Sequence, residues 1–211
     1  MRPVTFAASL LAVALTAPPV PAEPTVVLVG THRMKMKDDS VDPIFAGKRK
    51  FTWKVRSGLT APPENQVVVP EAGSDGDPTP GGATGGGGTL TVYNAAGSGE
   101  VYTVDLPAEN WRVAGDQFKG FRYVYASSAP VWKVWLKSPK ITVQGGKAPW
   151  EYTLDEASQG AIAVQLTLGT GITWCSTALP DDPAEKWDVQ DRFKAASAGA
   201  PPATCPAIPA P

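Results

Sequence analysis

The sequence predicts an all-β protein, an antiparallel two-sheet β-sandwich of about nine to eleven short strands. Apolar and polar residues alternate with a period of two along most of the chain, and Gly, Pro, Asn and Asp interrupt this alternation at short intervals. Helical periodicity is nearly absent, and a single turn of helix is expected within 182–194. Short connections between strands favour antiparallel pairing. A closed β-barrel shows the same alternation, so it remains the alternative architecture.

Residues 1–22 have the features of a signal peptide. Met1 and Arg2 form a short positive region, an apolar run extends from Val4 to Leu15, and residues 20–22 form a small-residue cleavage site. The apolar run is shorter than the roughly 20 residues that a membrane span needs. We therefore expect an exported protein, periplasmic or extracellular, with no membrane span.

Residues 23–175 are expected to form a single β-sandwich domain. The segments with clear alternation are 51–55, 90–92, 102–106, 121–125, 132–136, 141–143, 150–154 and 162–168. Weaker strand candidates are 26–36, 66–69 and 172–175. Tight turns are expected at Gly30 and within 94–97, 144–146 and 169–171.

The segment 70–88 interrupts this pattern. It contains Gly81-Gly82 and four consecutive glycines at 85–88, and no apolar residue larger than Ala and Pro. This composition predicts a long mobile loop in which the glycines act as a spacer. A phosphate-binding loop would need a Lys and a following helix, which the segment lacks.

Residues 176–211 form a Pro/Ala-rich segment, which we expect to be a C-terminal tail. The chain has two cysteines, Cys175 and Cys205, so one intramolecular pairing is available to them in an oxidising compartment. A disulfide between them would tie the tail back to the domain. Closing this loop of about 30 residues should stabilise the fold by roughly 3–4 kcal/mol.

Composition excludes several classes of chemistry. The only histidine is His32, and no GxSxG motif accompanies it, so a Ser-His-Asp hydrolase is not expected. Zinc sites that need several His or Cys ligands are excluded by the same count. The chain has 19 Lys+Arg and 20 Asp+Glu, and this net charge of −1 gives no indication of a nucleic acid or anionic membrane partner.

Two groups of residues are weak metal candidates. His32, Met34 and Met36 occupy alternate positions and would share one face of a regular strand, as a copper site requires. The simpler interpretation is a strand with two core methionines. Oxygen ligands for calcium are available from two loops, which contain Asp38, Asp39, Asp42, Asp75 and Asp77. Such residues are also ordinary turn formers, so no cofactor is expected.

A carboxylate pair for glycoside hydrolysis is the weakest of the chemical hypotheses. Glu151 and Asp155 would share a strand face at about 13 Å, farther apart than a retaining or an inverting pair. A hydrolase acting on polysaccharide is therefore a minor alternative.

The aromatic segment 131–137 carries the main functional hypothesis. Alternation directs Trp132 to the core and places Lys133, Trp135 and Lys137 on the solvent face. An exposed Trp can stack on a sugar ring or pack against another protein, and the neighbouring lysines can contact anionic groups.

Several motifs together resemble a β-rich unit that recurs in exported proteins of environmental bacteria, often near their C-termini. The motifs are 34–39, Asp42-Pro43, 48–50, 73–79, Leu106-Pro107-Ala108 with Trp111, 152–157, and Cys175 with Cys205-Pro206. The resemblance implies an exported folding module and assigns no activity or site. The function that we expect is a secreted, non-catalytic module that binds protein or glycan. A purely structural module of a surface assembly is the alternative.

Overall fold

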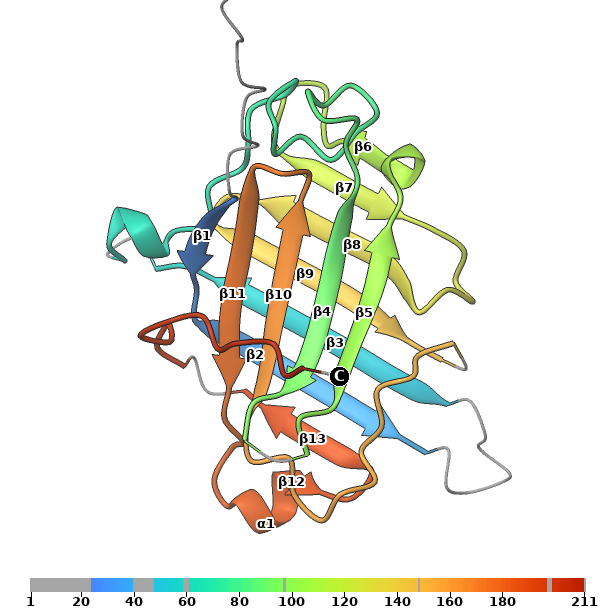
Figure 1. The fold of residues 1–211 in the computed structure, drawn as a ribbon, viewed down its shortest axis with the longest axis vertical. Helices are drawn as coiled ribbons and strands as arrows, with labels where there is room; N and C mark the ends of the chain where they lie inside the picture. The colour runs from blue at the N-terminus through green and yellow to red at the C-terminus, as the bar shows by residue number, and fades with distance from the viewer. Residues whose placement is uncertain are drawn as a thin grey trace, which may run out of the picture.

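The computed structural model describes residues 24–39, 48–58, 61–96, 98–147, 149–196 and 199–210. These residues form two sheets that lie face to face, one of five strands and one of eight, and neither closes into a barrel (Figure 1). The predicted all-β sandwich is therefore confirmed, and the barrel alternative is wrong. The expected signal peptide lies outside the described residues.

The elements follow the chain in the order of their labels. The strands are β1 Thr25–Leu28, β2 Thr31–Asp38, β3 Arg49–Arg56, β4 Gly88–Asn94, β5 Val101–Leu106, β6 Trp111–Val113, β7 Phe121–Val124, β8 Val131–Lys137, β9 Lys140–Gly146, β10 Ile162–Leu168, β11 Ile172–Ala178, β12 Asp188–Val189 and β13 Arg192–Ala195. The helical segments are η1 Pro63–Asn65, η2 Ala108–Asn110 and α1 Ala184–Trp187.

The five-stranded sheet has the order β1-β11-β10-β4-β5, and the eight-stranded sheet has the order β12-β13-β2-β3-β9-β8-β7-β6. All neighbours are antiparallel except β1 and β11, which are parallel. The chain leaves one sheet after β1 and enters the other at β2, passing through Gly30. A Cβ at Gly30 would lie 2.2 Å from the backbone oxygen of Gly199, so this crossing requires glycine.

The core fills the space between the two sheets. Large side chains dominate it, and its fully buried tryptophans are Trp53, Trp111, Trp150 and Trp174. The ring of Trp150 stacks on Phe51 with the ring centroids 4.5 Å apart. Trp53 of β3 spans the core and donates a hydrogen bond from its Nε1 to the Ser176 hydroxyl of β11 at 3.0 Å. The two sheets are thus held by apolar contact and by a buried polar contact.

Three predicted elements differ from the observed ones. The segment 150–154 keeps its alternation, with Trp150, Tyr152 and Leu154 buried, but it is extended without pairing to a sheet. The segment 66–69 also lacks ladder bonds. The expected turn at 144–146 lies instead within β9, so glycine here serves close packing of strands. Alternation reports which side chains are buried, and it does not report whether the backbone pairs.

The loop 70–88 is folded into a series of turns. The Asp77 carboxylate is buried and accepts hydrogen bonds from the backbone N–H groups of Gly73 at 2.7 Å and Thr79 at 2.8 Å. Gly86 has a φ of +74°, and a Cβ there would lie 2.0 Å from the Thr79 oxygen. The glycines therefore shape turns, and the spacer interpretation is wrong. The mobility of the loop stays a prediction.

The boundary predicted for the C-terminal tail is wrong. β11 continues to Ala178, and the chain then forms α1, β12 and β13 before leaving the sandwich. β13 pairs with β2, and the side chains of Phe193 and Ala195 enter the core. The helical turn lies within 182–194, as predicted. A four-residue strand with two inward side chains is too short a pattern to stand out among Pro, Ala and charged residues.

The last described segment, 199–210, crosses the outer face of the five-stranded sheet in front of β11 and β10 (Figure 1). The predicted disulfide joins Cys175 to Cys205, with a Cα–Cα distance of 5.7 Å. The Tyr93 hydroxyl donates a hydrogen bond to the Pro206 oxygen at 2.6 Å. Burial raises the pKa of Tyr93 above its ordinary value of 10.0, and the hydrogen bond from Gln165 opposes this shift. The chain thus covers part of the outer face of this sheet itself.

Candidate functional site

The outer face of the eight-stranded sheet carries the predicted aromatic surface. In β8, Val134 and Leu136 are buried, and Lys133, Trp135 and Lys137 point away from the core. The Trp135 side chain is 36% exposed. Alternation therefore predicted the orientation of Trp135 correctly.

The same alternation failed for Trp132. The register between β8 and β9 shifts between Val131 and Lys133, so Val131 takes the inward position and Trp132 is only half-buried. The Lys147 ammonium lies 5.5 Å from the centroid of the Trp132 ring. A β-bulge adds one residue to a strand and reverses the side-chain directions beyond it, which period-two reasoning from sequence does not detect.

Trp135 lines a shallow hollow of about 300 Å³ on this face. The other lining residues come from β8 and β9 and are Lys133, Lys137, Lys140, Thr142 and Gln144. The indole lies near two cations, with Lys133 Nζ at 5.5 Å and Arg122 Cζ at 5.9 Å from the ring centroid. The hollow thus combines an aromatic surface, hydrogen-bonding side chains and positive charge.

The positive charge extends over the whole outer face of this sheet. Thirteen of the 19 Lys and Arg residues occupy its outward positions, and no Asp or Glu does so on its described strands. The thirteen are Arg33, Lys35, Lys37, Lys50, Lys54, Arg56, Arg112, Arg122, Lys133, Lys137, Lys140, Arg192 and Lys194. We call this surface the basic face. No single segment of the sequence reveals it, because it is assembled from seven strands.

The copper arrangement does not form. The register of β2 against β3 shifts between Thr31 and Arg33, and His32 is exposed, whereas Met34 and Met36 are buried. The three side chains therefore do not share a face. The two methionines are core residues, which was the simpler interpretation.

The aspartates proposed for calcium are separated by their contacts. Asp38 points inward and binds Arg49 Nε at 3.0 Å, and Asp39 pairs with Lys37 at 2.7 Å. Asp75 is exposed, Asp77 binds backbone N–H groups of its own loop, and Asp42 lies outside the described residues. Across the described ranges, no group of three or more His, Cys, Asp or Glu side chains has the arrangement of a metal site.

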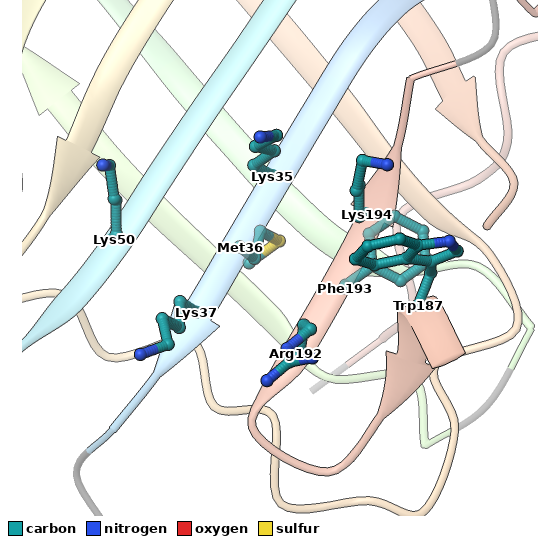
Figure 2. A pocket seen from close by; sticks show the side chains of 8 residues that line it. All are labelled: Lys35, Met36, Lys37, Lys50, Trp187, Arg192, Phe193 and Lys194. Atoms are coloured by element: carbon teal, nitrogen blue, oxygen red, sulfur yellow. The ribbon is translucent and has the colours of Figure 1, made fainter. Parts of the chain in front are cut away.

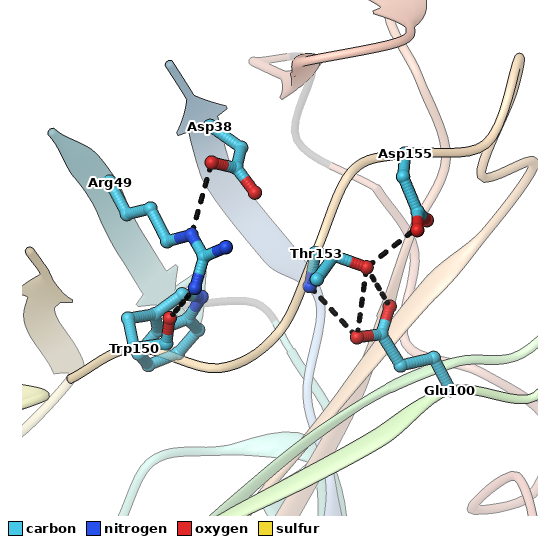
Figure 3. A network of polar contacts seen from close by, with 6 residues as sticks. All are labelled: Asp38, Arg49, Glu100, Trp150, Thr153 and Asp155. Carbon is cyan, nitrogen blue, oxygen red and sulfur yellow. Dashed lines mark hydrogen bonds and ion pairs between the residues drawn. The ribbon is translucent and has the colours of Figure 1, made fainter. Parts of the chain in front are cut away.

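The structure brings together a different carboxylate pair from the one considered in the sequence. Glu151 is exposed, but Glu100 and Asp155 flank the Thr153 hydroxyl, whose Oγ1 lies 3.1 Å from Glu100 Oε1 and 3.1 Å from Asp155 Oδ1 (Figure 3). The Thr153 backbone N–H also donates to Glu100, at 2.8 Å. These bonds fasten the segment after Trp150 to the start of β5. Sequence reasoning missed Glu100 because it lies about fifty residues from Thr153.

A second anchor holds the start of the same segment. The Arg49 guanidinium, which pairs with the inward-pointing Asp38, also donates a hydrogen bond to the backbone oxygen of Trp150 (Figure 3). The extended segment is thus tied to β3 at one end and to β5 at the other. We assign these polar groups a structural role, because each is engaged within the chain.

The Glu100 contacts predict a pH dependence of stability. Burial raises the pKa of Glu100 above its ordinary 4.5, the Thr153 hydrogen bonds oppose this shift, and repulsion by Asp155 and Glu156 adds to it. Above pH 4.5 the unfolded chain releases this proton before the folded chain does, so the free energy of unfolding falls as the pH rises through the raised pKa. In Glu100→Gln this loss should be absent.

Urea unfolding between about pH 4 and 7 measures this effect. The stability of Glu100→Gln relative to wild type should increase with pH over that window. Glu71→Gln, in the exposed part of the 70–88 loop, is the matched control and should run parallel to wild type. If the free energy of unfolding of Glu100→Gln ran parallel to that of wild type over this pH range, the prediction would be contradicted.

No family model, curated protein or solved structure matches the chain. Among the described residues, no helix has the length and apolar character needed to cross a membrane. The Cys175–Cys205 bond is typical of proteins outside the reducing cytosol. The basic face and the Trp135 hollow are therefore the features of the molecule that bear on its function.

Proposed function

We propose that the protein is an exported, non-catalytic module that binds a glycan at the Trp135 hollow. The observation that carries the proposal is the exposed indole in the hollow formed by β8 and β9. A flat aromatic surface stacks against the apolar face of a sugar ring. Thr142 and Gln144 beside it supply donors and acceptors for sugar hydroxyls. Among the described residues, no carboxylate lines this hollow, so binding without hydrolysis is the function that its side chains support.

The other outer face supports this choice of surface. The chain's own segment 199–210 lies against the five-stranded sheet, where Tyr93 and Cys175 are fully buried although they point away from the core. In the described part of the chain no comparable segment lies over Trp135. A large exposed aromatic on a sheet face is typical of an interaction site.

A glycan array probed with the intact, disulfide-bonded protein tests this proposal. Trp135→Ala should abolish binding to the glycans that wild type retains, and it should lower the free energy of unfolding by less than about 1 kcal/mol. Trp135→Phe keeps an aromatic ring and should retain part of the binding. Phe118→Ala removes an exposed ring outside the hollow and should bind as wild type does.

Two results would overturn the proposal. Unchanged binding by Trp135→Ala would place the glycan elsewhere on the molecule. An array on which wild type binds no glycan would favour the structural-module alternative.

A further inference from the structure

The charge on the basic face specifies the class of glycan. We infer that the ligand is an anionic polysaccharide, which lies across the strands from the Trp135 hollow to a second hollow beside Trp187. This inference rests on the proposed function and narrows it. The net charge of −1 gave no indication of an anionic partner, but net charge does not describe how charges are distributed over a surface.

Few of the cations on the basic face form an ion pair with a carboxylate of the chain. The structure pairs Lys37 with Asp39 and Lys194 with Asp181. For the other eleven of its thirteen cations, the described residues place no carboxylate within ion-pair distance. Several acidic side chains are buried instead, for example those of Asp38, Asp77 and Asp188. Acidic and basic groups are therefore segregated.

The cations also lie directly opposite one another on neighbouring strands. The like-charged cross-strand pairs are Arg33–Lys54, Lys35–Lys194, Lys37–Lys50, Lys37–Arg192, Arg56–Lys140, Arg112–Arg122 and Lys137–Lys140. Like charges opposite each other destabilise a sheet. Seven such pairs on one face oppose folding of the free protein, and a bound polyanion would relieve this repulsion.

A second hollow, of about 230 Å³, lies on this face between β3, β2 and β13 (Figure 2). Its cationic lining residues are Lys35, Lys37, Lys50, Arg192 and Lys194. Trp187 closes one side, and its ring centroid lies 3.8 Å from Lys194 Nζ. Small-molecule pockets have volumes of about 300–1,000 Å³, so this hollow is suited to one charged group of a longer ligand.

The two hollows are spaced for a polymer. β8 and β13 are four strand positions apart in the sheet order, which at about 4.8 Å per step is roughly 19 Å. Thr52 and Lys54 of β3 and Thr142 of β9 lie on the outer face between them. A chain of several sugars that carries anionic groups can contact both tryptophans and the intervening cations together.

The shape and chemistry of the face favour a polysaccharide over a nucleic acid. Proteins that recognise duplex DNA by sequence insert a helix or a strand into a groove. The basic face is instead the broad surface of an eight-stranded sheet. Single-stranded nucleic acid is held by successive aromatic platforms. Between Trp135 and Trp187 the described strands offer hydroxyl, amide and ammonium groups instead.

Binding of the intact protein to polygalacturonate tests the inference. The matched neutral probe is the fully methyl-esterified polymer, and the competitor is duplex DNA. Wild type should prefer the charged polymer, with an affinity that falls steeply with salt. Lys35→Gln/Lys50→Gln should weaken this binding roughly tenfold and reduce the slope of log affinity against log salt by about one to two. Lys119→Gln removes a positive charge from the exposed loop before β7, outside the basic face, and should stay within about threefold of wild type.

The outcomes separate the two proposals. Equal affinity for the charged and esterified polymers, or wild-type affinity in Lys35→Gln/Lys50→Gln, would overturn the anionic class and leave glycan binding at Trp135 in place. Loss of the preference only in Lys35→Gln/Lys50→Gln, with Trp135→Ala unaffected on every probe, would instead reject the Trp135 site. Tighter binding of duplex DNA than of polygalacturonate would reject the polysaccharide as ligand.

Discussion

Replacing Trp53 with alanine is expected to lower the free energy of unfolding by about 3–5 kcal/mol. The side chain is fully buried at the centre of β3 and contacts both sheets. Its removal leaves a cavity, because the surrounding sheets cannot collapse into a space of indole size. It also removes the 3.0 Å hydrogen bond to Ser176, which links β3 to the opposite sheet. A loss of this size approaches the whole stability of many small domains.

Trp132→Ala is the informative comparison for this measurement. Strict alternation along 131–137 would make Trp132 a core residue with a similarly large effect. The bulge leaves it half-buried beneath Lys147, so we expect less than half of the Trp53→Ala effect. Urea unfolding of both variants measures the difference. If Trp132→Ala were as destabilising as Trp53→Ala, the bulge observed between Val131 and Lys133 would be wrong. The outward orientation of Trp135 would stand, because strict alternation gives it as well.

The second large effect is expected from the disulfide. The double variant Cys175→Ser/Cys205→Ser should lose about 3–4 kcal/mol of unfolding free energy, since the cross-link spans 30 residues and restricts the unfolded chain. The fold itself should survive. β12 and β13 precede the tail, and β13 is held by pairing to β2 and β12 by pairing to β13, so the bond restrains only the segment after them.

Three measurements check this prediction. Thiol titration of the unfolded, non-reduced wild type should detect no free cysteine. Urea unfolding gives the stability loss, and far-ultraviolet circular dichroism should show unchanged strand content in the double variant. Detachment of the tail should also expose Tyr93 and lower its pKa toward the ordinary 10.0, which an absorbance titration records. If the double variant kept the wild-type stability and its Tyr93 kept the wild-type pKa, the tail would be held in place by its other contacts.

The fold class and the inward or outward direction of many strand residues followed from local pattern. The segments 51–55 of β3 and 162–168 of β10 were predicted because their inward residues are apolar and the intervening residues are polar or small. The disulfide followed from counting, since two cysteines allow one pairing. The outward direction of Trp135 followed from two buried neighbours at alternate positions. Each of these inferences depends on residues close in sequence, or on a count.

The candidate site depends on β-bulges and on contacts between residues that are far apart in the sequence. The bulges in β2 and β8 add a residue that no period-two pattern marks, so the copper set and the core position of Trp132 were both wrong. Glu100 meets Thr153 only because β5 and the 150–154 segment lie side by side in the folded chain. The basic face likewise forms only through strand pairing, because its cations lie on strands that are spread between residues 33 and 194 of the sequence.

The sequence by itself therefore determined most of the strands, the apolar face of most of them and the pairing of the two cysteines. The tertiary structure decided that β13 belongs to the eight-stranded sheet and that the tail covers the outer face of the other sheet. It also decided that thirteen cations share one open surface. The physical reason is that apolar burial acts on each strand through its own alternation, whereas an electrostatic surface depends on the distances between strands, which exist only after the sheet has formed.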